Sequence, residues 1–309
     1  MSTKELTPLT TLSSPGTSVG LLEPSQLQNG NLSPENIAFY QEYGFLIAPD
    51  LVNTDEIHAL KEETAAIFRG LRGIVEGTLP VKTGESDADV LKKYVAIHFP
   101  HKISELIRRF LHQRRIVDVL TGLLGPNVKA LQSMLFVKGP GKAGQSWHQD
   151  EFYIPTRDKS LIGVWIAIDD ATIENGCLWI IPGRPGYIMK RVDIESNEYA
   201  DTDSIDVSRY PSDAALPVEV KSGSVVFFNG YTLHSSRQNK TPDCFRRALV
   251  NHYMNADSML PWDQDGNLSP REDMRDIEIV AGIDPYAWKG IEDIIKPYLR
   301  PEKLNIKKN

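Results

Sequence analysis

The sequence contains only two cysteines in 309 residues, Cys177 and Cys244, which excludes a disulfide framework and a multi-cysteine zinc site. It has no run of about 18 apolar residues, so we expect no transmembrane helix and no membrane partner. It also has no block of Lys or Arg, and its formal net charge is −7, so we expect no nucleic-acid partner. These absences favour a soluble, cytoplasmic protein.

Several familiar catalytic patterns are missing as well. The run 138–143 contains Gly and Lys but lacks the spacing and the Ser or Thr of a phosphate-binding loop. There is no Gly-x-Ser-x-Gly nucleophile elbow and no His-Glu-x-x-His zinc helix. Residues 1–32 are rich in Ser, Thr, Pro and Gly, without the apolar core of a signal peptide, and predict a flexible leader. The chain ends in 306–309 without Ser-Lys-Leu, so we expect no peroxisomal address.

Helical patterns dominate the first part of the chain. Ser33–Glu35 combines a capping hydroxyl, a proline and an acidic residue, and predicts a helix that ends at Gly44. Phe45–Ala48 is typical of a short buried strand. Residues 70–90 lack any periodicity and predict a loop. Apolar stripes predict the remaining helices, which begin at Thr54 and cover 103–110 and 116–124.

From Val128 onward, short β-type runs alternate with turn residues, and the segment 187–215 is typical of an insertion between strands. Asn175-Gly176 predicts a hairpin with a type I′ turn. A final helix is expected over 285–299, interrupted at Pro297. The expected strands cover 129–137, 147–154, 162–168, 177–181, 216–220, 224–228 and 247–254.

Helices followed by seven or more short strands predict a mainly β fold, a double-sheet barrel of the jelly-roll or cupin type. We expect one domain after the leader, over 33–309. It would comprise a helical buttress (33–127), a β core (128–255) and a C-terminal extension (256–309) that carries the final helix.

The most informative motif is His148-Gln149-Asp150. On a strand, alternate residues share a face, so His148 and Asp150 would project to the same side. A histidine from a distant strand would complete the two imidazoles and one carboxylate that hold non-haem Fe(II). With seven His and 41 acidic residues, chance predicts about one His-x-Asp/Glu triplet. A surface His beside an Asp is therefore the alternative interpretation.

Two histidines compete for the third position. His234 follows an apolar strand and a glycine turn, which is where a ligand at a barrel mouth is expected. His252 also lies in a strand-like run, 249–254. We favour His234 because of the residues that follow it.

Three blocks, in this order along the chain, resemble the phytanoyl-CoA dioxygenase family: His148–Asp150, Gly163–Gly183 and His234–Leu249. The resemblance covers roughly residues 35–255. Members of this family are Fe(II)- and 2-oxoglutarate-dependent oxygenases with a double-stranded β-helix fold. The resemblance therefore implies that fold, iron as the metal, and 2-oxoglutarate and O2 as co-substrates, with release of succinate and CO2.

The resemblance also implies roles for individual residues. His148, Asp150 and His234 match the iron ligands. Arg246 matches the arginine that binds the distal carboxylate of 2-oxoglutarate, and Ser236 matches the hydroxyl that assists it. One extra residue between His234 and Arg246, compared with some members, leaves Arg247 as an alternative anchor. Three further co-substrate contacts are implied, the last by a looser match: Trp165, Gln132 and Lys93.

The substrate is less constrained. The absence of a basic cluster for the phosphates of coenzyme A favours a smaller metabolite over an acyl-CoA. Asp rather than Gly or Ala at position 150 favours hydroxylation over halogenation. The alternatives are a catalytically silent cupin-like metal-binding or sensing protein and a mononuclear metal dioxygenase that does not use 2-oxoglutarate. The oligomeric state stays open. Candidate substrate contacts are Phe152, Tyr153, Arg157 and Trp179.

Overall fold

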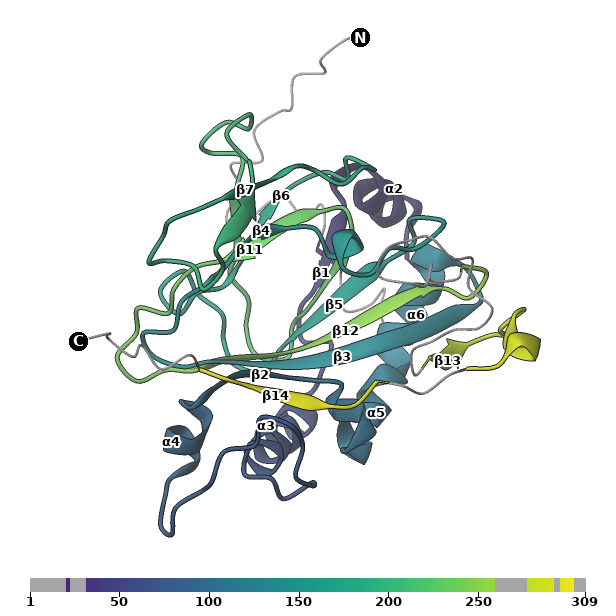
Figure 1. The fold of residues 1–309 in the computed structure, drawn as a ribbon. Helices are drawn as coiled ribbons and strands as arrows, with labels where there is room; N and C mark the ends of the chain where they lie inside the picture. The colour runs from purple at the N-terminus through teal and green to yellow at the C-terminus, as the bar shows by residue number, and fades with distance from the viewer. Residues whose placement is uncertain (1–20, 23–31, 259–276, 292–294, 303–309) are drawn as a thin grey trace.

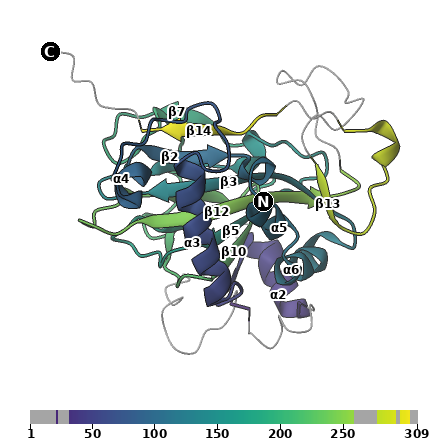
Figure 2. The ribbon, with the colours of Figure 1, turned by 90° about the horizontal axis from the view of Figure 1, so that it is seen from below.

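The computed structural model describes residues 21–22, 32–258, 277–291 and 295–302. The predicted leader lies mostly outside these residues. Two antiparallel sheets face each other, and helices cover the outer side of the larger sheet (Figures 1 and 2). A mainly β fold of two facing sheets was the predicted architecture.

Within the residues that the structure describes, the larger sheet has eight strands and the smaller has four. The larger runs in the order β1 (Phe45–Ala48), β10 (Val225–Asn229), β5 (Ile162–Ala167), β12 (Arg246–Asn255), β3 (Val128–Lys138), β2 (Tyr94–His98) and β14 (Tyr298–Pro301), with β13 (Glu278–Ala281) also paired to β3. The smaller runs in the order β4 (Gln145–His148), β11 (Leu233–Ser236), β6 (Leu178–Ile181) and β9 (Leu216–Val218). A separate hairpin joins β7 (Arg191–Asp193) to β8 (Asp203–Ile205) within the predicted insertion.

The four helices expected before residue 128 are confirmed, each with a capping side chain at its start. In the first, Ser33 accepts a hydrogen bond from the Asn36 amide at 3.2 Å, and Gly44 ends the helix with φ of 82°. The segment expected to be a loop, 70–90, contains the start of an additional short helix capped by Ser86. The helices are α2 (Pro34–Tyr43), α3 (Thr54–Phe68), α4 (Asp87–Leu91), α5 (Glu105–Leu111) and α6 (Arg114–Leu124). None of the helices among the described residues is long and apolar enough to cross a membrane.

The predicted C-terminal helix is wrong. The described part of 285–299 holds one short 3-10 turn, Ala287–Lys289, and Gly290 ends it with φ of 80°. The chain then forms β14, which pairs with the edge strand β2. The backbone N–H of Leu299 donates to Glu76 O at 2.8 Å, so tertiary pairing outweighs the weak helical pattern here.

Two predictions around the site need correction. The strand expected over 147–154 ends at His148, and Asp150–Phe152 forms a 3-10 turn, so the two ligands do not share one strand. Asn175-Gly176 is not a type I′ hairpin, because only the glycine has positive φ, at 79°. The strand after it, β6, pairs with β9 and β11 in the smaller sheet.

Candidate active site

A cavity of about 540 Å³ lies between the two sheets. The inner face of the larger sheet lines one side of it. Successive cross-strand partners form one row on that face, and every member lines the cavity: Tyr298, His98, Met134, Val250 and Trp165.

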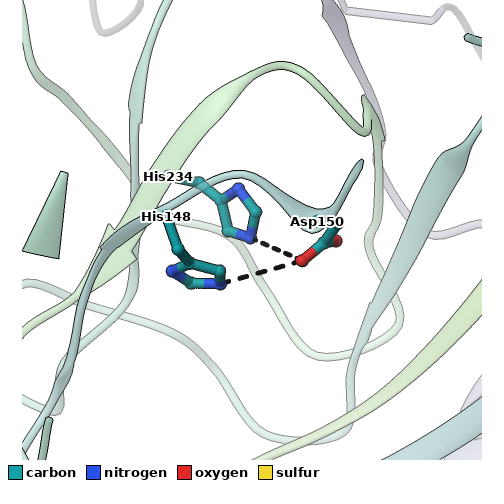
Figure 3. Close-up of side chains that lie close together, drawn as sticks. All are labelled: His148, Asp150 and His234. Atoms are coloured by element: carbon teal, nitrogen blue, oxygen red, sulfur yellow. Dashed lines mark ion pairs between the residues drawn. The ribbon is translucent and has the colours of Figure 1, made fainter. Parts of the chain in front are cut away.

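The structure brings His148, Asp150 and His234 together at this cavity, with one possible ligand atom of each within 4.8 Å of the others (Figure 3). His148 and His234 are directly opposed on the neighbouring strands β4 and β11. Their Nε2 atoms lie 3.8 and 3.5 Å from Oδ1 of Asp150. Three converging donors of this kind form a candidate metal site.

Backbone carbonyl groups orient both imidazoles. Nδ1 of His148 lies 2.7 Å from Ser146 O, and Nδ1 of His234 lies 3.0 Å from Thr232 O. A carbonyl oxygen can only accept, so Nδ1 carries the proton in each ring and donates it. In its neutral form, each ring therefore presents the Nε2 lone pair to a metal ion.

Burial and the neighbouring charges set the protonation states. Burial lowers the pKa of His148 to about 3, and His234 adds to this effect, so His148 is neutral at pH 7. Burial by itself would raise the pKa of Asp150, but the adjacent His234 and His252 outweigh it and hold that pKa well below its usual range. Burial also lowers the pKa of His234, but Asp150 raises it above the ordinary value. The carboxylate is thus ionised and ready to bind a cation.

His252, the rival for the third position, binds the opposite oxygen of the carboxylate. Its Nε2 lies 2.9 Å from Asp150 Oδ2, whereas the two ligand imidazoles face Oδ1. Gln132 Nε2 lies 3.2 Å from His252 Nδ1, and the amide donates to this nitrogen when His252 Nε2 carries the proton. Gln132, predicted as a co-substrate contact, lines the cavity, and its hydrogen bonds in this structure go to His252 and the Met134 sulfur.

Arg246 supplies a buried positive charge to the same cavity. Its side chain is 5% exposed, and burial lowers its pKa to about 10. Nε donates to Gly176 O at 3.2 Å, and the guanidinium lies 5.7 Å from the centre of the Trp165 ring. Within the described part of the chain, no carboxylate pairs with it, so the cavity wall carries an uncompensated cation suited to an anion.

Arg247, the alternative anchor, points elsewhere. It forms a bidentate ion pair with Asp169, with Nε and Nη2 each 2.7 Å from a carboxylate oxygen. Arg247 does not line the cavity. The alternation of side chains along β12 separates the two neighbouring arginines.

Ser236 lines the same cavity as Arg246, and Lys138 orients its hydroxyl group. Lys138 Nζ and the Gln145 backbone N–H both donate to Ser236 Oγ, at 2.8 and 3.2 Å. The hydroxyl proton of Ser236 is therefore free to be donated to a bound molecule. The sequence offered no signal for Lys138, which is buried and directly opposite Arg246 in the β3–β12 register.

Of the remaining predicted contacts, some line the cavity and others do not. Tyr153 lines the cavity, whereas Phe152, Arg157 and Trp179 do not. The Arg237 guanidinium covers the Trp179 ring at 3.9 Å. Lys93 also lies outside the cavity lining, and its ammonium group binds Glu85 and Pro80 O.

The two-sheet fold and the buried His-Asp-His set define a class of protein, the non-haem iron oxygenases built on a double-stranded β-helix. The phytanoyl-CoA dioxygenase family model matches residues 40–248, and the chain belongs to this family. Fold class, family and enzyme class, as a 2-oxoglutarate-dependent oxygenase, are thus as predicted.

Individual relatives agree with this assignment. The chain is 27% identical to phytanoyl-CoA dioxygenase 1 of Oryza sativa subsp. japonica, over 74% of this chain and 91% of that protein. It is 30% identical to the peroxisomal phytanoyl-CoA dioxygenase of Mus musculus, over 81% of this chain and 76% of the relative. Among solved structures it is similar to SnoK, a non-heme alpha ketoglutarate dependent carbocyclase from nogalamycin biosynthesis, with a TM-score of 0.59 and 26% identity over 81% of this chain and 97% of SnoK.

Proposed function

We propose that this enzyme hydroxylates an unactivated C–H bond of a small-molecule metabolite, and that His148, Asp150 and His234 hold its Fe(II). The observation that carries the proposal is the buried Arg246 guanidinium. It faces the same cavity as the three ligands and has no carboxylate partner among the described residues. An anionic co-substrate is the partner that this charge requires, because an isolated buried charge is costly.

The residues present fit iron and 2-oxoglutarate. Two neutral nitrogen donors and one carboxylate are the ligand set that non-haem Fe(II) takes while leaving positions open. When bound, iron and 2-oxoglutarate supply the oxidising chemistry with O2. The protein contributes position: Arg246 pairs with the distal carboxylate and the Ser236 hydroxyl donates to it. Trp165 and Phe228 add apolar surface to the cavity wall.

Several features support the finer parts of the proposal. An aspartate at position 150 favours hydroxylation, because halogenation would need a vacant coordination position there. The intact ligand set, together with Arg246 and Ser236, favours an enzyme over a silent binding protein. We place the protein in the cytoplasm, which the free thiols of Cys177 and Cys244 support. Fractionation of the source cells followed by immunoblotting tests that location.

Adding Fe(II) and 2-oxoglutarate without oxygen tests the site, because the complex gives a weak visible charge-transfer band. His148→Ala should abolish the band. Arg246→Gln should raise the 2-oxoglutarate concentration needed for half the band by at least about tenfold, since a charged bidentate contact is lost. Product analysis by mass spectrometry under oxygen should then show succinate and a substrate heavier by one oxygen atom.

Arg247→Gln is the matched control, because it removes the same charge one residue away. It should leave the 2-oxoglutarate requirement unchanged but lower the unfolding free energy, since its ion pair with Asp169 is lost. An absent band in the unmodified protein would refute the proposed function. Equal 2-oxoglutarate requirements for the two variants would refute Arg246 as the anchor.

A further inference from the structure

The cavity extends beyond the segment that matches the family. Three of its lining residues, Tyr298, Arg300 and Glu302, come from the C-terminal strand β14 and the residue after it. The family match covers residues 40–248 only. β14 lies along β2 at the edge of the larger sheet (Figure 2). This part of the cavity is therefore built by a segment outside the matched region.

The register of β14 explains why its residues reach the cavity. Tyr298 is opposite His98 on β2, and Arg300 is opposite Ala96. Leu299, between them, is 3% exposed and packs into the hydrophobic core. The Tyr298 ring stacks on the His98 ring, with centroids 4.5 Å apart and planes 7° apart. Alternation along the strand thus presents a flat aromatic surface and a guanidinium to the same space.

The acidic side chains at this end of the cavity bind groups other than Arg300. Glu302 pairs with Lys142 at 2.6 Å, so its carboxylate is already neutralised. Asp201, the other acidic residue of the lining away from the metal ligands, accepts a hydrogen bond from the Ser146 amide at 2.7 Å. Arg300 has no ion-pair partner among the residues that the structure describes. Arg300 is solvent-exposed and lines the cavity, so its guanidinium is accessible to a bound molecule.

The position of Arg300 separates it from the co-substrate charge. β14 is three strands away from β12, which carries Arg246 and His252. Three strand spacings amount to about 14 Å. Between them, Met134 and Phe136 on β3 give the cavity an apolar floor. A molecule that reached from Arg300 across this floor would therefore contact it through an apolar body.

We propose that β14 forms the substrate-recognition wall of this enzyme, and that Arg300 binds an anionic oxygen group, a carboxylate or a phosphate, of a substrate with an apolar body. This inference rests on the proposed function, because it concerns the substrate of the same site. Tyr298 and His98 would contact the apolar body, and Arg300 would hold the anionic end away from the metal.

The test compares probes that differ only in charge. The full chain, saturated with Fe(II) and 2-oxoglutarate without oxygen, is titrated calorimetrically with octanoate and with octanamide. Saturation with 2-oxoglutarate keeps Arg246 occupied. We expect octanoate to bind about tenfold more tightly than octanamide, as one charge-assisted hydrogen bond implies. Octyl phosphate, titrated in the same way, tells which anion the site prefers.

Variants assign the preference to particular side chains. Arg300→Gln should remove the preference for octanoate and leave octanamide binding unchanged, and Arg300→Lys should restore part of it. Tyr298→Leu should weaken both probes by the same factor, because it removes apolar contact only. Arg109→Gln, which removes an exposed charge outside this cavity, should change neither.

The outcomes separate the two proposals. Equal binding of the two probes, no binding of either, or a preference that persists in Arg300→Gln would each overturn the role of Arg300. Loss of octanamide binding in Arg300→Gln would overturn it too, since a charge effect predicts none. The charge-transfer band is recorded on the same samples. Its absence would instead count against the proposed function.

Discussion

Replacing His252 by Phe is expected to weaken metal binding although His252 is not one of the three ligands. The change removes the N–H group that lies 2.9 Å from Asp150 Oδ2. That hydrogen bond holds the carboxylate with its other oxygen toward His148 and His234. Loss of such an outer contact typically lowers metal affinity about 10- to 100-fold. This corresponds to about 1.4 to 2.7 kcal/mol.

The measurement is a competition titration of Co(II) against a chromophoric chelator, followed without oxygen or substrate. His252→Gln should recover much of the lost affinity, because its amide can still donate toward Asp150. His98→Phe is the matched control: His98 lines the same cavity, but no hydrogen bond joins it to the ligands. If His252→Phe and the unmodified protein bind Co(II) equally well, the carboxylate does not depend on His252 and the argument fails.

Three further predictions follow from buried groups. Iodoacetamide at neutral pH should label exposed Cys244 and leave Cys177 unmodified until denaturant is added, because burial raises the pKa of Cys177 to about 12. Peptide mass spectrometry measures the labelling, and labelling of Cys177 in the folded protein would contradict the prediction. Burial lowers the pKa of His98 from 6.5 to about 4, so its contribution to stability is complete above pH 6.5 and is lost as the pH falls toward 4, by at most about 3 kcal/mol. In urea unfolding, His98→Phe should therefore lose less unfolding free energy than the unmodified protein over this pH range. An equal loss in both proteins would contradict the lowered pKa of His98. Gly163→Ala would place Cβ 2.6 Å from the Phe228 ring and should lower the unfolding free energy by about 1 to 3 kcal/mol in thermal or urea unfolding. An unchanged unfolding free energy would show that the Phe228 ring moves aside without cost.

Local patterns were sufficient to predict most elements of the fold. Helix caps such as Ser33 and strand runs such as that before His234 are encoded by residues close in sequence. β14 was misread because its four residues include a proline and follow a weak helical pattern. Its partner β2 lies about two hundred residues earlier, so no local signal could reveal the pairing.

The same distinction applies to the site. His148-Gln149-Asp150 could be found because its chemistry lies in one short motif. The partnership of His252 with Asp150 joins residues 102 positions apart, and that of Lys138 with Ser236 joins residues 98 apart. Both depend on how segments far apart in the sequence pack together in the fold, which a single sequence does not display.

The two halves of the candidate site belong to different sheets. His148 and His234 lie in the smaller sheet, whereas Arg246 lies in the larger one. A molecule that binds the metal at one end and Arg246 at the other would tether the two sheets across the barrel. Ligand binding and resistance to unfolding should therefore be linked, so that the filled enzyme opens less often than the empty one. The barrel would then be held closed partly by the molecule it consumes and would loosen after each turnover.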